Sequence, residues 1–218
     1  MTYSIAVFLS GSGTNLQALL DAQDAGQLGG AQISFVLSDK ADAFGLQRAL
    51  RRDIPAAFVP LPRMPDAAAR AVARADWEQR ILAVTRPFAP DLIVLSGFLR
   101  VLSADFLASS PAPMINQHPA LLPEHGDMLI TDAGHEIPAL RGLHVVAEAL
   151  RRRLPVTGCT VHRVTPIVDA GPLLGRAEVP ILPDDDEESL HERIKVAERR
   201  TIVEVVARLA REHGAESV

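Results

Sequence analysis

Residues Asp91–Ser96 read DLIVLS, which is the most continuous apolar run in the chain. A run of branched aliphatic residues like this is typical of a strand that is buried on both faces of a sheet. Upstream of it, apolar runs alternate with segments in which apolar residues recur at helical spacing. We expect strands at Ser4–Leu9, Ala31–Leu37 and Ala56–Val59, and helices at Asn15–Ala25, Phe44–Arg52 and Asp66–Thr85. This order predicts an α/β fold with a Rossmann-like, mostly parallel sheet, helices on both faces and right-handed crossovers.

The half of the chain downstream of this run predicts a different arrangement, in which antiparallel strands extend the sheet. The expected elements are a very short strand at Met114–Asn116, a long irregular stretch at Leu121–Arg141, a helix at Leu143–Arg153, antiparallel strands at Gly158–Val164 and Leu173–Val179, and a final helix at about Glu187–Arg211. No internal repeat, low-complexity tract or linker separates the two halves. We therefore expect a single domain over residues 1–218, with halves at about 1–100 and about 101–218.

The composition excludes several classes of function. The chain is 48% hydrophobic and 22% charged, which is ordinary for a soluble globular protein. A formal net charge of −5 predicts no broad positive surface for nucleic acid, although it allows a local positive pocket for one phosphate. The N-terminal apolar run is too short to cross a bilayer, and the single cysteine, Cys159, indicates a reducing compartment. We therefore expect a cytoplasmic protein with small-molecule substrates and without nucleic-acid or membrane partners.

A glycine-containing segment, Gly11-Ser12-Gly13-Thr14-Asn15, lies between the first expected strand and the helix that follows it. Glycines let the backbone approach a ligand closely, and the N–H groups at a helix start attract anions. The segment does not match the dinucleotide fingerprint, because Leu16 stands where the third glycine would be, and it lacks the lysine of a P-loop. Two interpretations remain open, a phosphate site and a tight turn capped by Thr14 or Asn15.

A second segment, Asn116–Pro123, reads NQHPALLP and follows an expected strand at the edge where open α/β sheets bind ligands. Asn116 and His118 are two residues apart, so on extended backbone their side chains point to the same side. Asn116 can donate to a developing oxyanion, and His118 can transfer a proton near neutral pH. The alternative is that both side chains satisfy buried loop carbonyls.

Two further segments carry candidate polar residues. Asp169 begins a turn that reads DAGP, and a carboxylate there beside His118 would raise the basicity of the imidazole and select its tautomer. His162 lies on an alternating strand, which is more typical of a satisfied core histidine. We interpret Ser38–Gly45 as the start of a helix, and its residues predict no catalytic role.

Six stretches, taken in order along the chain, resemble the phosphoribosylglycinamide formyltransferase family. They are GSGTNLQALL, SDKADAFGL, LSGFLRVLS, NQHPALLP, GCTVHRVTPIVDAGPLL and the acidic helix start that runs into Glu198. The resemblance implies an enzyme that moves a formyl group from 10-formyltetrahydrofolate to the amine of 5′-phosphoribosylglycinamide in purine biosynthesis. It implies no metal, and a monomer or a homodimer.

The resemblance also implies roles for individual residues. The catalytic residues would be Asn116, His118 and Asp169. The substrate phosphate and ribose would be held by Gly11, Ser12, Gly13, Thr14, Asn15, Arg63 and Glu198. The folate pocket would be lined by Arg100, Val101, Leu102, Thr165, Pro166, Ile167 and Val168. The first half of the chain would then bind the nucleotide phosphate, and the second half would carry catalysis and folate binding.

One departure separates this chain from the family pattern. In the family the Leu-Leu-Pro motif is followed closely by a Pro-Gly-x-His element, whereas here residues Glu124–Arg141 come before Gly142, and Arg141 stands in place of the proline. Surface insertions cost little closure entropy, so we expect a tolerated excursion. The alternative is a lid or an oligomer contact beside the catalytic loop.

Other activities share parts of this pattern. A methionyl-tRNA formyltransferase has the same Asn-x-His loop, but the acidic charge balance counts against tRNA binding. A formyltetrahydrofolate hydrolase, a non-catalytic nucleotide-binding module and a nicotinamide-binding protein remain as alternatives. Substrate-dependent turnover separates the transferase from each of them.

Overall fold

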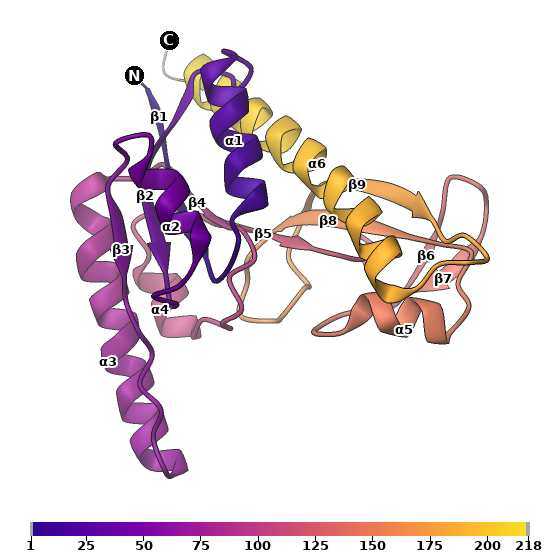
Figure 1. Ribbon diagram of the computed structural model, residues 1–218, viewed down its shortest axis with the longest axis horizontal. Helices are drawn as coiled ribbons and strands as arrows, with labels where there is room; N and C mark the ends of the chain where they lie inside the picture. The colour runs from indigo at the N-terminus through magenta and orange to yellow at the C-terminus, as the bar shows by residue number, and fades with distance from the viewer. Residues whose placement is uncertain (1, 217–218) are drawn as a thin grey trace.

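A computed structural model describes residues 2–216, and its centre is a seven-stranded sheet (Figure 1). The strand order is β3-β2-β1-β4-β5-β8-β9. Neighbours from β3 to β5 pair in parallel, whereas β8 pairs antiparallel with β5, and β9 antiparallel with β8. The strands are β1 (Tyr3–Leu9), β2 (Ala31–Ser38), β3 (Ala56–Phe58), β4 (Leu92–Leu95), β5 (Met114–His118), β8 (Val156–Arg163) and β9 (Leu173–Pro180). The predicted parallel sheet with an antiparallel C-terminal extension is confirmed.

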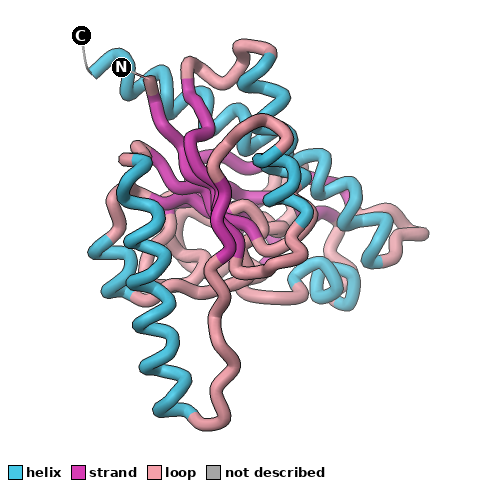
Figure 2. Tube along the Cα trace, turned by 60° about the vertical axis from the view of Figure 1, so that its left-hand side comes forward, coloured by secondary structure: helices cyan, strands magenta, loops and turns pink. Residues whose placement is uncertain are grey.

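Helices cover both faces of the sheet, as Figure 2 shows from a second direction. One face packs against α1 (Thr14–Asp24), α2 (Phe44–Leu50) and α6 (Glu187–Glu216), and the other against α3 (Ala67–Thr85) and α4 (Ala104–Ser109). A short 3₁₀ helix, η1 (Arg86–Phe88), follows α3, and α5 (Val145–Arg151) packs against β8 and β9. Successive residues of β1 alternate between the two cores, with Val7 in the first and Phe8 in the second. This two-sided burial explains why the central strands are apolar without interruption.

Helix α6 crosses the sheet diagonally and joins its two halves (Figure 1). Ile202 and Val206 on α6 are fully buried in the core that α1 shares with β1. Near the far end of the helix, the ring of His213 lies 5.1 Å from the ring of Tyr3. None of the helices within residues 2–216 combines the length and the apolar character needed to cross a membrane.

Two expectations for the middle of the chain are wrong. The stretch Leu121–Arg141 is not irregular, because β6 (Met128–Ile130) and β7 (Glu136–Pro138) form an antiparallel hairpin within it. Each strand has three residues and buries one apolar side chain, Leu129 or Ile137, which is too little to produce a periodic sequence pattern. Strand β5 also continues past Asn116 to His118, since β8 pairs with its full C-terminal end.

Gly158, in the interior of β8, tests how closely the C-terminal strands pack. A Cβ at this position would lie 2.0 Å from the Ala177 carbonyl oxygen on β9 and 2.8 Å from the Leu121 side chain. We expect Gly158→Ala to lower the free energy of unfolding by about 1–3 kcal/mol, as overpacking does elsewhere. Gly214→Ala is the matched control, because nothing lies within 4 Å of its Cβ position and alanine favours helix. Urea unfolding measures the free energy of unfolding of both variants. Equal values for Gly158→Ala and Gly214→Ala would contradict the close packing of β8 against β9.

Candidate active site

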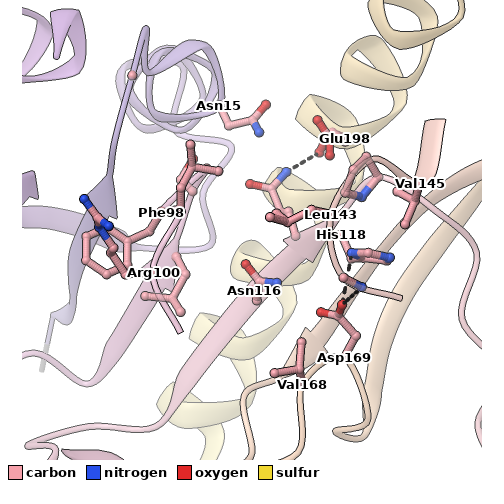
Figure 3. Close-up of a pocket in the computed structure, with 18 of the residues that line it drawn as sticks. Asn15, Phe98, Arg100, Asn116, His118, Leu143, Val145, Val168, Asp169 and Glu198 are labelled. Carbon is pink, nitrogen blue, oxygen red and sulfur yellow. Dashed lines mark hydrogen bonds and ion pairs between the residues drawn. The ribbon is translucent and has the colours of Figure 1, made fainter. Parts of the chain in front are cut away.

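A cavity of about 760 Å³ opens at the carboxyl ends of the parallel strands (Figure 3). It lies where the chain leaves β1 toward one edge of the sheet and leaves β4 toward the other, the switch point at which such folds bind ligands. Its size suits small substrates rather than a polymer. The cavity is lined by the segment Gly11–Asn15, called the glycine loop below, and by the segment after β4, which reaches Leu102. The end of β5, residues 142–146, the turn after β8 and one face of α6 complete the lining.

The glycine loop ends in an uncapped helix N-terminus. Gly13 has a φ of +68° and no side chain caps α1, so the first N–H groups of the helix remain available to an anion. Only glycine fits here, because a Cβ on Gly13 would lie 2.7 Å from the Cα of Gly45. The Gly45 N–H also donates to the Gly11 carbonyl at 3.1 Å. The segment 38–45, for which the sequence predicted no role, therefore supports the glycine loop from behind.

One face of α6 supplies charged groups to the cavity. Besides Glu198, which the resemblance assigned to the ribose, the cavity is lined by Glu187, His191 and Lys195. These three were not predicted as site residues, although spacings of four, four and three residues place them and Glu198 on one helical face. Burial raises the pKa of Glu198 to about 7, and a hydrogen bond with Asn15 opposes that shift. Burial beside Lys195 lowers the pKa of His191.

Two buried amide oxygens face this region without a hydrogen-bond partner among the described residues. They are Asn15 Oδ1 and Gln117 Oε1. The Gln117 amide nitrogen is held by the Glu198 carbonyl at 3.2 Å, which fixes the orientation of the side chain. Buried acceptors without donors are costly, so this end of the cavity favours a ligand that carries several N–H or O–H groups.

The pairing of β5 with β8 gathers the other polar side chains of the cavity. Asn116 lies directly opposite His162, and His118 opposite Thr160, so all four side chains share one face of the sheet. Asn116 Nδ2 lies 3.4 Å from His162 Nε2. The Thr160 hydroxyl donates to the Ala120 carbonyl at 2.8 Å, which secures the loop that follows His118. The sequence interpretation of His162 as a core histidine is incomplete, since its ring is buried but also lines the cavity.

Asp169 completes this cluster from the turn after β8. Its Oδ2 lies 3.4 Å from His118 Nδ1 (Figure 3), and its Oδ1 lies 3.5 Å from His162 Nε2. The Gly142 N–H donates to Oδ2 at 2.8 Å. Asp169 has a φ of +52°, which is uncommon for a residue other than glycine and turns its carboxylate back toward the histidines. The structure thus brings Asn116, His118 and Asp169 together.

Burial and charge oppose each other in this cluster. Burial lowers the pKa of His118, while the Asp169 carboxylate and the Leu140 carbonyl act in the opposite direction. Burial acts to raise the pKa of Asp169, but the hydrogen bond from His162, the charge of His118 and the Gly142 N–H outweigh it, so this pKa is lowered. Asp169 is therefore ionised at neutral pH, beside a histidine that gives up its proton readily.

The opposite wall of the cavity is apolar and open to solvent. Leu99, Val101 and Ile167 are exposed large aliphatic side chains that line it. Between them, Arg100 Nε donates to the buried Asp39 carboxylate at 2.7 Å, and the Ser10 hydroxyl donates to the other oxygen of Asp39 at 2.6 Å. These contacts tie the segment after β4 to the ends of β1 and β2. Exposed apolar surface beside fixed polar groups suits a flat, partly apolar ligand.

Most residues that the resemblance assigned to substrates line this one cavity. They are Gly11, Ser12, Gly13, Thr14, Asn15, Glu198, Arg100, Val101, Leu102, Thr165, Ile167 and Val168. Pro166 lies in the same turn but does not line the cavity, and Arg63 lies in the exposed loop before α3, outside it. The substrate role of Arg63 stays a prediction. Within residues 2–216 no group of three or more histidine, cysteine or acidic side chains is placed to hold a metal ion.

Comparison with known proteins relates this chain to formyltransferases. The family model described as formyl transferase matches residues 3–206. A phosphoribosylglycinamide formyltransferase of Mycobacterium tuberculosis is 40% identical over 96% of this chain and 86% of its own length. The Escherichia coli protein of the same name is 32% identical over 89% of this chain and 81% of its own length. The trifunctional purine biosynthetic protein adenosine-3 of Drosophila melanogaster is 40% identical over 94% of this chain, which spans 14% of the length of that protein.

Solved structures agree with these relatives. The phosphoribosylglycinamide formyltransferase of Coxiella burnetii, solved in complex with CHES, superposes with a TM-score of 0.79 at 35% identity. The match covers 96% of this chain and 88% of that one.

The raised pKa of Glu198 predicts a pH dependence of stability. Because the pKa rises from 4.5 to about 7 on folding, the unfolded chain releases this proton first as the pH increases. Glu198 therefore favours the folded state at low pH. This contribution to the free energy of unfolding is lost as the pH rises between the two pKa values, at about 1.4 kcal/mol per pKa unit. We expect the free energy of unfolding of wild type, relative to Glu198→Gln, to fall by ~3 kcal/mol between pH 4.5 and 7. Urea unfolding at several pH values measures it, and parallel curves would contradict the expectation.

Proposed function

The chain belongs to the formyl transferase family, and we propose that it transfers the formyl group of 10-formyltetrahydrofolate to the amine of 5′-phosphoribosylglycinamide. The observation that carries this proposal is that three kinds of group line one cavity. They are the uncapped start of α1, which can bind an anion, an apolar wall, and the Asn116–His118–Asp169 cluster. A phosphorylated amine and a folate would bind in the same cavity and meet at the cluster.

The end of the cavity near α1 suits the phosphate and ribose of the acceptor. The free N–H groups after Gly13 can hold a phosphate, and Lys195 adds positive charge from α6. Asn15 Oδ1, Gln117 Oε1 and the Glu198 carboxyl can accept hydrogen bonds from ribose hydroxyls and the glycinamide N–H groups. Pairing these buried acceptors with ligand donors would remove their desolvation cost, which gives a phosphoribosyl amine an advantage over a simple amine.

The apolar end suits the folate co-substrate. Leu99, Val101 and Ile167 offer contact area for a flat ring, and backbone groups of the segment after β4 can recognise its polar edge. Arg100 is held by Asp39, so its role here is to fix the shape of this segment. The same residues leave the cavity mouth open for the remainder of the folate molecule.

The central cluster suits acyl transfer. The substrate amine would attack the formyl carbon, and the Asn116 amide would donate to the oxygen that becomes negative in the tetrahedral species. The C–N bond to the folate nitrogen would then break as that nitrogen gains the proton that the attacking amine loses. Asp169, ionised and held by Gly142 and the two histidines, is placed to relay this proton, and His118 stabilises the charge.

The setting of the reaction follows from the same features. We propose that the chain acts as one unit, because a single sheet runs through both the phosphate-binding half and the catalytic half. Burial raises the pKa of the Cys159 thiol to about 11, so it stays protonated and takes no part in transfer. A cytoplasmic location and a monomer or homodimer remain the expectations.

The purified chain tests the proposal directly. We expect deformylation of a 10-formylfolate donor, followed by absorbance, to require 5′-phosphoribosylglycinamide and to yield the formylated ribonucleotide. Deformylation without the ribonucleotide would indicate a hydrolase instead. Binding of either ligand without turnover would indicate a non-catalytic nucleotide-binding module.

The catalytic assignment predicts two variant effects. Asn116→Ala removes the oxyanion donor and should lower kcat by about 10²–10³-fold. Asp169→Asn removes the carboxylate that relays the proton and should lower kcat by about 10²–10⁴-fold. Asp105→Asn, a matched change at an exposed site on α4, should leave kcat unchanged. Steady-state kinetics on folded variants measures this, and near-normal turnover in Asn116→Ala or Asp169→Asn would show that the cluster is misassigned.

A further inference from the structure

The inserted segment, residues 124–141, packs against the catalytic loop on two sides. Leu129 and Ile137 of its hairpin lie in one apolar cluster with Leu121, two residues beyond Pro119. Leu140, at the end of the segment, is buried against Ala120 and against helix α5. If the segment were only a tolerated surface insertion, these neighbouring residues would be buried by the rest of the protein. Here the segment forms part of the wall behind His118.

The last residues of the segment reach the catalytic histidine itself. His118 Nε2 lies 2.7 Å from the Leu140 carbonyl oxygen, which can only accept a hydrogen bond, so Nε2 must carry the proton. The other ring nitrogen, Nδ1, then faces Asp169 at 3.4 Å. A proton that His118 takes up can therefore enter only at Nδ1, between the ring and the Asp169 carboxylate. The Leu140 carbonyl thus decides which nitrogen works with Asp169.

Arg141 holds the other partner of this pair. Its Nε donates to the Asp169 backbone carbonyl at 3.2 Å, which helps to keep this residue at its φ of +52°. Its two terminal nitrogens bind the Gly126 carbonyl at 2.8 Å and the Asp127 carboxylate at 2.7 Å, both at the start of the segment. A planar guanidinium can bridge three acceptors in fixed directions, which an ammonium cannot do. The Asp127 carboxylate is exposed, so its ion pair mainly orients the guanidinium.

We propose that the inserted segment is a positioning device of the active site, in which the Leu140 carbonyl selects the tautomer of His118 and Arg141 fixes the turn that carries Asp169. Arg141 does not line the cavity, so it acts through Asp169 rather than on substrate. The inference deepens the proposed function, because its effect on rate requires that the chain turn over its substrates. The tautomer of His118 does not depend on turnover and can be measured separately.

The kinetic arm compares Arg141→Ala, Arg141→Lys and Arg152→Ala. We expect Arg141→Ala to lower kcat by about 10–100-fold, the usual effect of losing a group that orients a catalytic residue. The KM for 5′-phosphoribosylglycinamide should stay unchanged, because its proposed subsite lies at the glycine loop and α6. Arg141→Lys should recover only part of the loss. Arg152→Ala should match wild type, since Arg152 pairs with Glu148 on the surface of α5, away from Asp169 and His118.

The spectroscopic arm measures the side-chain nitrogens of the histidines by ¹⁵N NMR in wild type, with His118→Gln used to assign the signal of His118. Above its titration midpoint, His118 should show a protonated Nε2 and a bare Nδ1. A bare Nε2 would overturn the role of Leu140 whether or not the enzyme is active. Wild-type kcat in a folded Arg141→Ala variant would overturn the role of Arg141. A wild-type protein without turnover would instead refute the proposed function, and the tautomer result would still stand.

Discussion

The hydrogen-bond ladder between β5 and the antiparallel β8 determines which side chains can meet at the base of the cavity. Its register places Asn116 opposite His162 and His118 opposite Thr160, all on one face. A shift of β8 by one residue would move His162 and Thr160 to the other face, away from Asn116 and His118. The turn between β8 and β9 carries Asp169, and both of its ends are fixed because β9 returns alongside β8. Parallel pairing alone could not have produced this convergence, since a parallel neighbour would need a long crossover in place of this turn.

The sequence predicted most of the fold because the central strands are buried on both sides and the first helices have apolar residues at clear helical spacing. It also placed the glycine loop, Asn116 and His118 at the ends of strands, where the cavity lies, since glycines at a strand end and polar residues two apart leave a local pattern. It missed the β6–β7 hairpin, whose three-residue strands are too short to show a period. It predicted His162 to be a core residue. The ring is buried and also lines the cavity, and only the pairing of His162 with Asn116 across the two strands reveals the second property. The approach of Gly45 to Gly13 joins segments about thirty residues apart and has no local signature.

The cavity keeps several polar groups at the expense of stability. Asn15 Oδ1 and Gln117 Oε1 are buried without partners in the described part of the chain, and burial keeps the pKa of Glu198 near neutrality. Each arrangement costs free energy in the unliganded protein, and a ligand with complementary donors would recover that cost. Substrate binding and folded-state stability are therefore coupled at this end of the site, and ligands that satisfy these groups raise the free energy of unfolding by mass action.

The contact between the rings of Tyr3 and His213 brings the first strand and the last helix together at the edge of the sheet opposite the cavity. Strand β1 begins at that edge and delivers the glycine loop only at its other end, so both described ends of the fold lie away from the chemistry. Chain connectivity at this edge is therefore free to change. A short linker between the two ends, with new ends opened in a surface loop, would give a circular permutant whose cavity is unaltered. For the same reason the fold can be joined in tandem to other enzymes within one polypeptide, with neighbouring modules attached at a single edge.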